Sequence, residues 1–366
     1  MCERLNILYQ KKPCYDIVYA QGFEALLTEL ENLELSGRKA CIVTDSKVGA
    51  LYADCLKELL SGIHKEVFVF TFEAGEEHKN LDTIRQAYTF LIENHLDRKD
   101  YLIALGGGVT GDMCGFLAAT YLRGIDFIQV PTTLLAFADS SIGGKTGVDF
   151  DGYKNMVGAF KMPRLVYMNI DVLHTLDDRQ YYAGFAEIMK HGLIKNASFY
   201  EWLIENMYEI CDREPETIKK MLYQSNEVKK LVVEKDPTEQ GDRALLNFGH
   251  TIGHAIEKAS DFKLLHGECV ALGCVAAAFI SWKKEYLSME EYYEVRDMFV
   301  PFNLPISMDN IAPETILKYT KSDKKMVQGK CKFVLLKKIG KAFICTDVTD
   351  QEILDAVNEL IFKDED

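Results

Sequence analysis

The first half of the chain alternates short apolar runs with amphipathic stretches. Short apolar runs rich in Ile, Val and aromatic side chains predict buried strands. They occupy residues 40–44, 67–72, 101–105 and 125–130. Between them, apolar side chains recur at three- and four-residue spacing, which predicts helices at 51–61 and 81–95. Strands that alternate with helices predict a parallel sheet covered on both faces.

The pattern changes near residue 177, where helical periodicity takes over. Predicted helices occupy residues 177–195, 215–233, 245–259, 267–286, 289–300 and 351–362. Residues 332–336 and 342–346 flank Lys-Lys-Ile-Gly-Lys and predict one β-hairpin. No linker rich in Pro, Gly or Ser separates the halves. We therefore predict an α/β domain over residues 1–176 and a mainly helical domain over 177–366.

Composition narrows the class of protein. With 366 residues, 48 % of them apolar and 27 % charged, the chain is globular and long enough for two cores. A net charge of −14 argues against nucleic acid or an anionic membrane as partner, because Lys and Arg bind phosphates. The apolar run at 269–282 is too short to span a bilayer. Ten cysteines without a C-x-x-C pair, and no signal-peptide pattern at the start, predict a cytoplasmic location.

A glycine-rich turn follows the predicted strand at 101–105. Residues 106–112 read Gly-Gly-Gly-Val-Thr-Gly-Asp and satisfy G-x-G-x-x-G before a helix-like stretch. Such a turn exposes backbone N–H groups to a phosphate at a helix start. The same glycines are also explained by a tight turn that needs positive φ, so the turn alone leaves both interpretations open.

Acidic residues near the other strands help to decide whether the glycine turn binds a phosphate or is only a tight turn. Asp126, at the spacing of the usual ribose contact, begins a strand instead of ending one, which departs from the standard fingerprint. Asp45 and the turn from Gly75 through Glu76 to Lys79 instead follow strands, where ligands of parallel sheets bind. We expect a dinucleotide whose ribose contact is differently placed.

Three histidines and one glutamate suggest a metal site. His250 and His254 lie one helical turn apart on one face, and His266 follows, so spacing alone nominates His250 with His254 as paired ligands. Glu187 is a lone acid among apolar helix positions, although a surface glutamate at a helix start would look the same. Three N or O ligands with an open position are typical of a catalytic metal. A metal beside a dinucleotide indicates oxidation of a hydroxyl group.

Basic and amide residues lie next to these motifs. Most scattered lysines are surface residues, but positions beside glycine turns and apolar helices in an acidic chain predict an anion pocket. The candidates are Lys145, Lys154, Asn155, Lys190, Lys229, Arg243 and Asn247. Asp139, within Phe-Ala-Asp-Ser-Ser, would be costly to bury without a partner or a function.

Five motifs follow one another along the chain. They are Gly-Gly-Gly-Val-Thr-Gly-Asp (106–112), Val-Pro-Thr-Thr-Leu-Leu-Ala-x-x-Asp-Ser-Ser-Ile-Gly-Gly-Lys-Thr (130–146), Gly-x-Lys-Asn-Met-Val-Gly-Ala-Phe (152–160), Ala-Glu-Ile-Met-Lys-His-Gly (186–192) and Asn-Phe-Gly-His-Thr-x-Gly-His-Ala-Ile-Glu (247–257). In order and spacing, the set resembles the 3-dehydroquinate synthase family over nearly the whole chain.

The resemblance implies a Rossmann-like NAD domain, a helical metal domain and a homodimer in which Arg123 reaches the neighbouring active site. It implies zinc, replaceable by cobalt, bound by Glu187, His250 and His266. His254 then becomes a substrate or proton-transfer residue instead of a ligand. This differs from the pair that spacing nominates.

The resemblance also carries residue roles to this chain. NAD contacts fall on Gly75, Glu76, Lys79, Gly108, Val109, Thr110, Gly111, Asp112, Thr132, Thr133, Asp139, Lys145, Lys154, Leu173 and Thr175, and the strand-end position adds Asp45. Substrate contacts fall on Arg123, Lys145, Asn155, Lys190, Lys229, Arg243 and Asn247. The catalytic set is His254, Lys145, Lys190, Asp139 and Lys229. Lys324 or Lys325, in a motif like the family's late lysine motif, faces the substrate, and we assign this role to Lys324.

The implied reaction converts 3-deoxy-D-arabino-heptulosonate 7-phosphate to 3-dehydroquinate and phosphate in the shikimate pathway. Its steps are transient oxidation by NAD, β-elimination of phosphate, re-reduction and intramolecular aldol closure. The alternatives are a metal-dependent polyol dehydrogenase, another sugar phosphate cyclase, and a non-catalytic nucleotide- or metal-binding protein. A cyclase of uncharged sugars should lack some basic residues, and none that we align is replaced.

Overall fold

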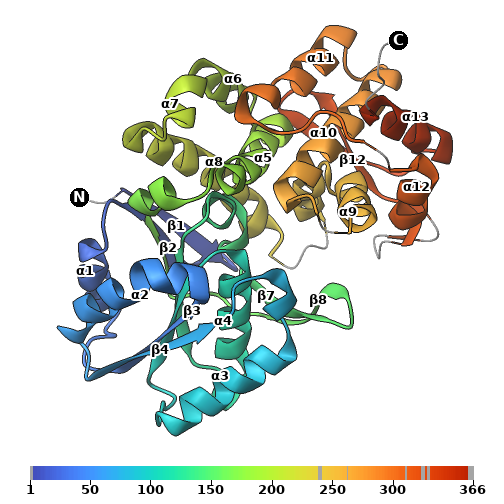
Figure 1. Cartoon of the computed structure of the whole chain (residues 1–366). Coiled ribbons are helices and arrows are strands. Elements are labelled where there is room, and N and C mark those ends of the chain that lie inside the picture. The colour runs from blue at the N-terminus through green and yellow to red at the C-terminus, as the bar shows by residue number, and fades with distance from the viewer. Residues whose placement is uncertain are drawn as a thin grey trace. The chain divides into compact units, whose positions relative to one another are not determined.

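The computed structural model describes residues 3–237, 241–261, 263–309, 311–322, 326–327 and 330–361. The chain forms two compact units, Met1–Leu176 and Asp177–Asp366. In Figure 1 the first unit runs from blue to green and the second from green to red. The first combines a sheet with helices, and the second is mainly helical. The predicted fold class is confirmed.

A seven-stranded sheet of order β1-β2-β9-β6-β5-β3-β4 organises the first unit. Its strands are β1 (Glu3–Tyr9), β2 (Lys12–Ala20), β3 (Lys39–Asp45), β4 (Glu66–Phe72), β5 (Tyr101–Gly106), β6 (Asp126–Pro131) and β9 (Leu165–Asn169). Only β1 runs antiparallel to its neighbour, and the other pairs are parallel. The four predicted strands match β3 to β6. The apolar-run criterion missed β1 and β2 because this hairpin mixes polar with apolar residues.

Helices cover both faces of the sheet in this unit (Figure 1). They are α1 (Glu24–Asn32), α2 (Ser46–Ser61), α3 (Leu81–Glu93) and α4 (Gly108–Thr120). On one face, Val43 and Ala104 pack in a core with Leu117 of α4. On the other face, α2 lies against Thr44 and Thr71, which alternate with the core positions. The helix predicted at 51–61 corresponds to α2, which begins earlier, at Ser46.

Shorter elements complete the first unit. A separate antiparallel hairpin, β7 (Lys145–Phe150) and β8 (Tyr153–Phe160), packs against α4. Short helical turns form η1 (Glu76–His78), η2 (Tyr121–Arg123), η3 (Ala136–Ser140) and η4 (Ile170–Thr175). These turns follow β4, α4, β6 and β9, so they join the sheet to its surroundings.

The second unit is built around α10 (His266–Lys283). Nearly every side chain of α10 is buried, as expected of a helix that is apolar all round. It packs against α5 (Asp178–Lys195), α9 (His250–Ala259), α11 (Met289–Asp297), α13 (Asp350–Leu360) and β12 (Phe333–Lys338). The predicted hairpin is confirmed, with β12 pairing antiparallel to β13 (Lys341–Cys345).

The remaining elements of this unit are α6 (Ala197–Glu205), α7 (Met207–Cys211), α8 (Pro215–Lys235), η5 (Asp242–Asn247), η6 (Val300–Phe302), α12 (Pro313–Ser322), β10 (Met326–Val327) and β11 (Lys330–Cys331). The described cysteines are free thiols. None of the helices in the described ranges has the length and apolar character needed to cross a membrane.

One predicted helix is wrong. Residues 245–259 do not form one helix, because η5 ends at Asn247 and α9 begins at His250. Gly249 between them has φ +79°, a left-handed conformation that disfavours any residue with a Cβ. A Cβ there would also lie 2.6 Å from the Cys274 sulfur. The break makes His250 the first residue of α9.

Candidate active site

Backbone contacts between helices bring the predicted metal ligands together. A Cβ at Gly267, in the first turn of α10, would overlap the carbonyl oxygen of Ala183 in α5. A Cβ at Gly273 would overlap the carbonyl oxygen of Gly249, directly before α9. Only glycine permits such close approach. Therefore α10 lies backbone against backbone on both helices, and its first residue, His266, lies near them.

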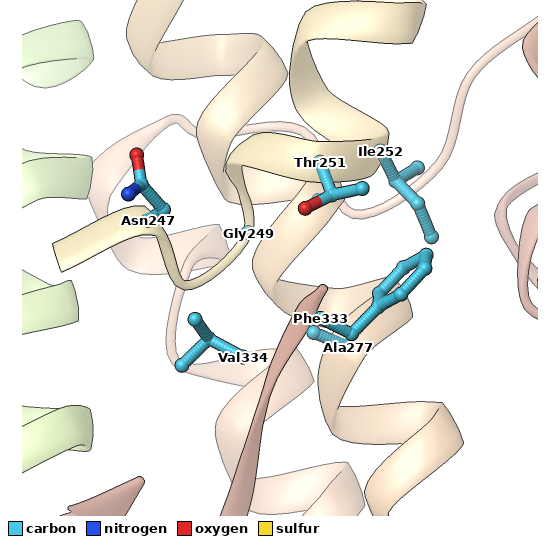
Figure 2. Close-up of a pocket in the computed structure, with 8 residues that line it drawn as sticks. Asn247, Gly249, Thr251, Ile252, Ala277, Phe333 and Val334 are labelled. Atoms are coloured by element: carbon cyan, nitrogen blue, oxygen red, sulfur yellow. The ribbon is translucent and has the colours of Figure 1, made fainter. Parts of the chain in front are cut away.

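A small cavity remains where α9, α10 and β12 meet (Figure 2). It is lined by Asn247, Gly249, Thr251, Ile252, Gly273, Ala277, Phe333 and Val334. Its volume of about 10 Å³ suits one water molecule. The cavity is too small for a sugar phosphate, so we interpret it as a packing gap between these elements.

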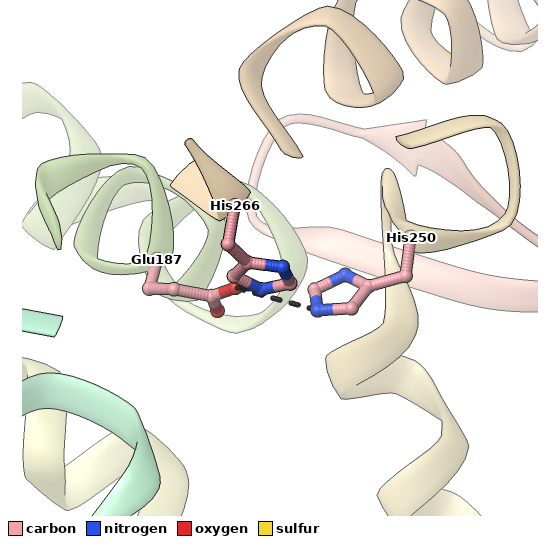
Figure 3. A group of neighbouring side chains, drawn as sticks. All are labelled: Glu187, His250 and His266. Atoms are coloured by element: carbon pink, nitrogen blue, oxygen red, sulfur yellow. Dashed lines mark ion pairs between the residues drawn. The ribbon is translucent and has the colours of Figure 1, made fainter. Parts of the chain in front are cut away.

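Glu187, His250 and His266 converge from α5, α9 and α10 (Figure 3). The Glu187 Oε1 atom lies 3.3 Å from Nε2 of His250 and 3.6 Å from Nε2 of His266. One potential ligand atom from each residue lies within 4.8 Å of the other two. One carboxylate and two imidazoles form a donor set typical of catalytic zinc or cobalt.

The environment of Glu187 tests whether this set fits a cation. The carboxylate is fully buried, and Lys190, one turn further along α5, forms an ion pair with its Oε2 atom. Lys190 thus serves Oε2, while Oε1 faces only the Nε2 atoms of His250 and His266, at 3.3 and 3.6 Å, among the described residues. A buried carboxylate costs free energy unless its acceptors are used. Two imidazole nitrogens aimed at such a carboxylate fit a divalent metal.

The protonation states of two of the three residues also suit metal binding. Burial opposes ionisation of Glu187, but Lys190 and His250 hold the pKa of this carboxyl well below its usual range. Burial, reinforced by Lys190, lowers the pKa of His250 to about 4. Burial acts the same way on His266, but Glu187 and Glu257 raise its pKa to about 9. An ionised carboxylate and a neutral imidazole are the ligand forms, so Glu187 and His250 are in the form that binds a metal, whereas His266 must release a proton when a cation binds.

A backbone hydrogen bond sets the orientation of His250. Its Nδ1 atom lies 3.1 Å from the carbonyl oxygen of Phe248. If Nδ1 carries the proton and donates it to this oxygen, Nε2 presents its lone pair toward Glu187. The chain break at Gly249 therefore both starts α9 and orients the first histidine.

His254 lies nearby without joining the group around Glu187. Its ring centroid is 5.2 Å from that of His250 and 5.8 Å from that of His266. A ligand atom of His254 instead groups with His266 and Glu257. The geometry favours His266 over His254 as the partner of Glu187 and His250, which the spacing of the two α9 histidines could not distinguish.

Three buried basic residues lie on elements that pack together in this unit. Lys190 is on α5, Lys229 on α8 and Arg243 on η5, and each pair of these elements is in contact. The Arg243 guanidinium donates to the Pro237 carbonyl oxygen at 2.5 Å. Asn247 ends η5 and is half-buried. Burial of several cations on adjoining elements is consistent with the predicted anion pocket.

The glycine turn of the first unit lies between β5 and α4. Gly106, Gly107 and Gly108 are not among the glycines with positive φ, so the positive-φ interpretation is wrong. Close packing explains the turn better, because a Cβ at Gly106 would overlap Thr110 and one at Gly111 would lie 2.8 Å from Gln129. No side chain caps the start of α4, so its first N–H groups can meet a phosphate.

Polar residues gather in this unit on segments that follow β3, β4 and β5. Asp45 caps α2, accepting from the Lys47 and Val48 backbones at 3.0 Å, and its other oxygen accepts from the Thr110 hydroxyl at 3.3 Å. A carboxylate that caps a helix beside the glycine turn lies where the ligands of parallel sheets bind.

Lys79 is the centre of a second polar group. Its buried ammonium lies 2.8 Å from Asp112 and 2.7 Å from Asn155. Glu76 lies 3.9 Å from both Lys79 and Lys154. Burial opposes the charge on Lys79, but Asp112 and Glu76 raise its pKa. These contacts join Asn155, a predicted substrate residue, to predicted NAD residues.

Other predicted residues occupy the surrounding segments. The Thr132 backbone donates a hydrogen bond to the Gly106 carbonyl oxygen at 3.0 Å. The Thr133 hydroxyl accepts one from the Ala136 backbone at 3.2 Å. The Thr175 hydroxyl is hydrogen-bonded to the Tyr52 hydroxyl. Gly75 precedes η1, Val109 lies in α4, Leu173 is buried in η4, Asp139 is in η3, and Lys145 begins β7. Arg123 is exposed in η2. Lys324 lies outside the described residues.

Comparisons with known proteins decide the family. The family models of the 3-dehydroquinate synthase N-terminal and C-terminal regions match residues 69–183 and 184–326. A 3-dehydroquinate synthase of Acetivibrio thermocellus is 41 % identical over 355 residues, 97 % of this chain and 98 % of the relative. One of Nitrosomonas europaea is 44 % identical over 331 residues, 90 % of this chain and 89 % of the relative.

The chain belongs to the 3-dehydroquinate synthase family.

Solved structures with the fold of this 3-dehydroquinate synthase family member include two that hold NAD+ and a metal. A 2-deoxy-scyllo-inosose synthase complexed with carbaglucose-6-phosphate, NAD+ and Co2+ is 25 % identical, with a TM-score of 0.88 over 98 % of this chain and all of that one. The 2-epi-5-epi-valiolone synthase ValA of Streptomyces hygroscopicus subsp. jinggangensis 5008, with NAD+ and Zn2+ bound, is 27 % identical, with a TM-score of 0.88 over 97 % of this chain and 99 % of that one.

A more distant likeness shows the fold alone. A glycerol dehydrogenase of Schizosaccharomyces pombe is 15 % identical, with a TM-score of 0.68 over 98 % of this chain and 91 % of that one. The polyol dehydrogenase alternative therefore shares the architecture but lacks the sequence identity that the 3-dehydroquinate synthases have.

Sequence reasoning missed some residues that shape this site. Arg179 of α5 binds both oxygens of Glu268 in α10, at 2.7 and 2.8 Å, and so ties together the two helices that carry Glu187 and His266. Glu257 lies beside His266. Glu257 could have been found from the sequence, because it follows His250 and His254 at helical spacing on one face of α9. No local pattern predicts the pairing of Arg179 with Glu268.

Proposed function

We propose that this chain catalyses the 3-dehydroquinate synthase reaction, in which 3-deoxy-D-arabino-heptulosonate 7-phosphate yields 3-dehydroquinate and inorganic phosphate. The observation that carries the proposal is the convergence of buried Glu187 with His250 and His266 in a chain 41 % identical, over 97 % of its length, to a 3-dehydroquinate synthase. The cyclases with the same fold hold NAD+ with Co2+ or Zn2+.

The chain would bind two cofactors, a metal ion and a dinucleotide, whose chemistry its own side chains cannot supply. Glu187, His250 and His266 would bind a divalent cation, zinc or cobalt, which supplies a Lewis acid. The segments after β3, β4 and β5 would bind NAD, which supplies a reversible hydride acceptor. Because the hydride is returned, the enzyme is a lyase without net redox change.

The basic residues would bind and orient the substrate. Lys190, Lys229 and Arg243 carry fixed positive charge inside the second unit, where an anion gains strong charge-assisted hydrogen bonds. Holding a phosphate and a carboxylate at fixed positions restricts the freedom of the intermediates during elimination and ring closure. His254 lies beside the ligating histidines and would bind substrate or transfer a proton.

We further propose the assembly and location that the family implies. The chain acts as a cytoplasmic homodimer, and Arg123, exposed in η2, reaches the neighbouring active site. Mixing an Arg123→Ala chain with a Glu187→Ala chain tests this arrangement. Mixed dimers should regain activity in one of their two sites, and a mixture as inactive as its components would contradict it.

The competing assignment is that the chain is a cyclase that acts on another substrate. The structural likeness to two such cyclases favours it. Identity separates the two assignments, because the 3-dehydroquinate synthase relatives reach 41 to 44 % against 25 and 27 % for those cyclases. The chemical distinction lies in the substrate pocket, because a 3-dehydroquinate synthase must bind the carboxylate of its substrate as well as the phosphate.

The decisive experiment supplies the heptulosonate phosphate with NAD and either Zn2+ or Co2+. Release of inorganic phosphate together with a product that co-elutes with 3-dehydroquinate supports the proposal. The control substrate is a heptulose phosphate without the carboxylate, which should be turned over poorly. Preference for that control would favour another cyclase, and steady NADH accumulation on a polyol without phosphate release would favour a dehydrogenase.

A further inference from the structure

His266 lies between two carboxylates, one at each ring nitrogen. Its Nε2 atom faces Oε1 of Glu187 at 3.6 Å, and its Nδ1 atom faces Oε2 of Glu257 at 3.7 Å. An imidazole offers a metal one lone pair and keeps its proton on the other nitrogen. The two sides of this ring are therefore chemically different, with the candidate metal ligand on one side and Glu257 on the other.

The same arrangement recurs at His250 with a different acceptor. Nε2 of His250 faces Glu187, and its Nδ1 faces the backbone carbonyl of Phe248 at 3.1 Å. Each imidazole thus has an acceptor behind it, supplied by the backbone in one case and by the Glu257 side chain in the other. An acceptor at Nδ1 fixes the tautomer and the ring orientation of a ligating histidine.

The location of Glu257 explains how it reaches this position. His250, His254 and Glu257 follow one another at intervals of one helical turn, so they share one face of α9. The Glu257 side chain is only 7 % exposed. A carboxylate that is so buried requires a polar partner, and the imidazole of His266 is one that the structure places beside it.

We infer that Glu257 is a positioning residue for the metal centre: it accepts the Nδ1 proton of His266 and holds the ring so that Nε2 faces the cation. The inference rests on the proposed metal site, and it assigns no ligand role to Glu257. Shortening of the 3.7 Å separation to a hydrogen bond would accompany metal binding.

The test compares metal affinity in the full-length protein, measured by Co2+ titration with the visible spectrum as readout and by Zn2+ competition with a chelator. Glu257→Gln keeps a neutral acceptor, and Glu257→Leu removes the acceptor while filling the space. We expect affinity to fall about 10- to 100-fold for the leucine variant and less for the glutamine variant. Glu352→Gln is the matched control, because it removes a carboxylate paired with Lys284 in the same unit.

The outcomes separate the possible roles of Glu257. One metal per chain in the wild type, with graded affinity in the order Glu, Gln, Leu, supports the inference. Unchanged affinity in both variants, with only the thermal stability of the metal-free protein lowered, would overturn it. Two metals per wild-type chain and one per variant would make Glu257 a ligand, which also overturns it. A wild type that binds no metal would instead refute the proposed function.

Discussion

The Nε2 atom of His250 lies 3.3 Å from the Oε1 atom of Glu187, although α6, α7, α8 and η5 separate the two residues along the chain. The pair joins a carboxylate that has no solvent exposure to a neutral imidazole whose other nitrogen faces a backbone carbonyl. Such a pair is costly to bury unless a further group uses it. The predictions below test that explanation and the packing that produces the pair.

Glu187→Ala should abolish both metal binding and turnover, because it removes the only carboxylate in the proposed ligand set. Elemental analysis and phosphate release measure the two effects, and we expect activity to fall by at least about 1,000-fold. The exposed Glu201→Ala variant in α6 is the control and should behave as the wild type. Full turnover by a metal-free Glu187→Ala protein would exclude the proposed metal centre.

His250→Ala and His254→Ala should separate metal binding from catalysis. Loss of His250 removes a ligand facing Glu187, so metal content should fall with activity. Loss of His254 should leave one metal per chain while turnover drops about 100- to 10,000-fold, the range for loss of a proton-transfer group. Metal content measured after gel filtration distinguishes them. Loss of metal in both variants would instead support His250 and His254 as the paired ligands that helical spacing nominates.

Gly267→Ala should disrupt the approach of α10 to α5, because the new Cβ would overlap the Ala183 carbonyl oxygen. We expect the free energy of unfolding to fall by about 3 kcal/mol, as for overpacked interiors, and metal affinity to fall as His266 moves. Urea denaturation and Co2+ titration measure the two effects. In Gly62→Ala the nearest atom is 3.5 Å from the new Cβ, so its stability should hardly change. Equal stability of both variants would contradict the packing argument.

His64 should make the first unit less stable at acidic pH. Burial lowers the pKa of His64, which is hydrogen-bonded to Tyr101 at 2.8 Å. Below pH about 6.5 the unfolded chain takes up a proton that the folded chain takes up only at lower pH, so the free energy of unfolding falls by up to about 1.4 kcal/mol per pH unit. His64→Gln does not titrate and should show a smaller loss between pH 6.5 and 5. Parallel pH profiles for the two proteins would contradict this assignment.

Local pattern predicted much of the fold because burial leaves a periodic trace in the sequence. The strands β3, β5 and β6 are buried on both faces and appear as continuous apolar runs. The edge strand β4 is only partly buried but is also rich in apolar residues, and α3, α5 and α8 appear as apolar residues at helical spacing. The half-polar hairpin of β1 and β2 left no such trace. The break at Gly249 was missed because helical periodicity continues across it, while its cause is a close contact with Cys274 on another helix.

The sequence by itself determined which residues could serve the site: an acid alone among apolar positions, histidines one helical turn apart, glycines between a strand and a helix, and basic residues in an acidic chain. Only the tertiary structure decided how they group. Helical spacing placed His250 and His254 on one face of α9, but could not say what that face meets. The answer lies in α10, whose Gly267 and Gly273 let it pack against α5 and the start of α9, so that His266 joins Glu187 and His250 while Glu257 lies behind it. Contacts between segments distant in sequence leave no periodic signal, so they had to be seen in the folded chain.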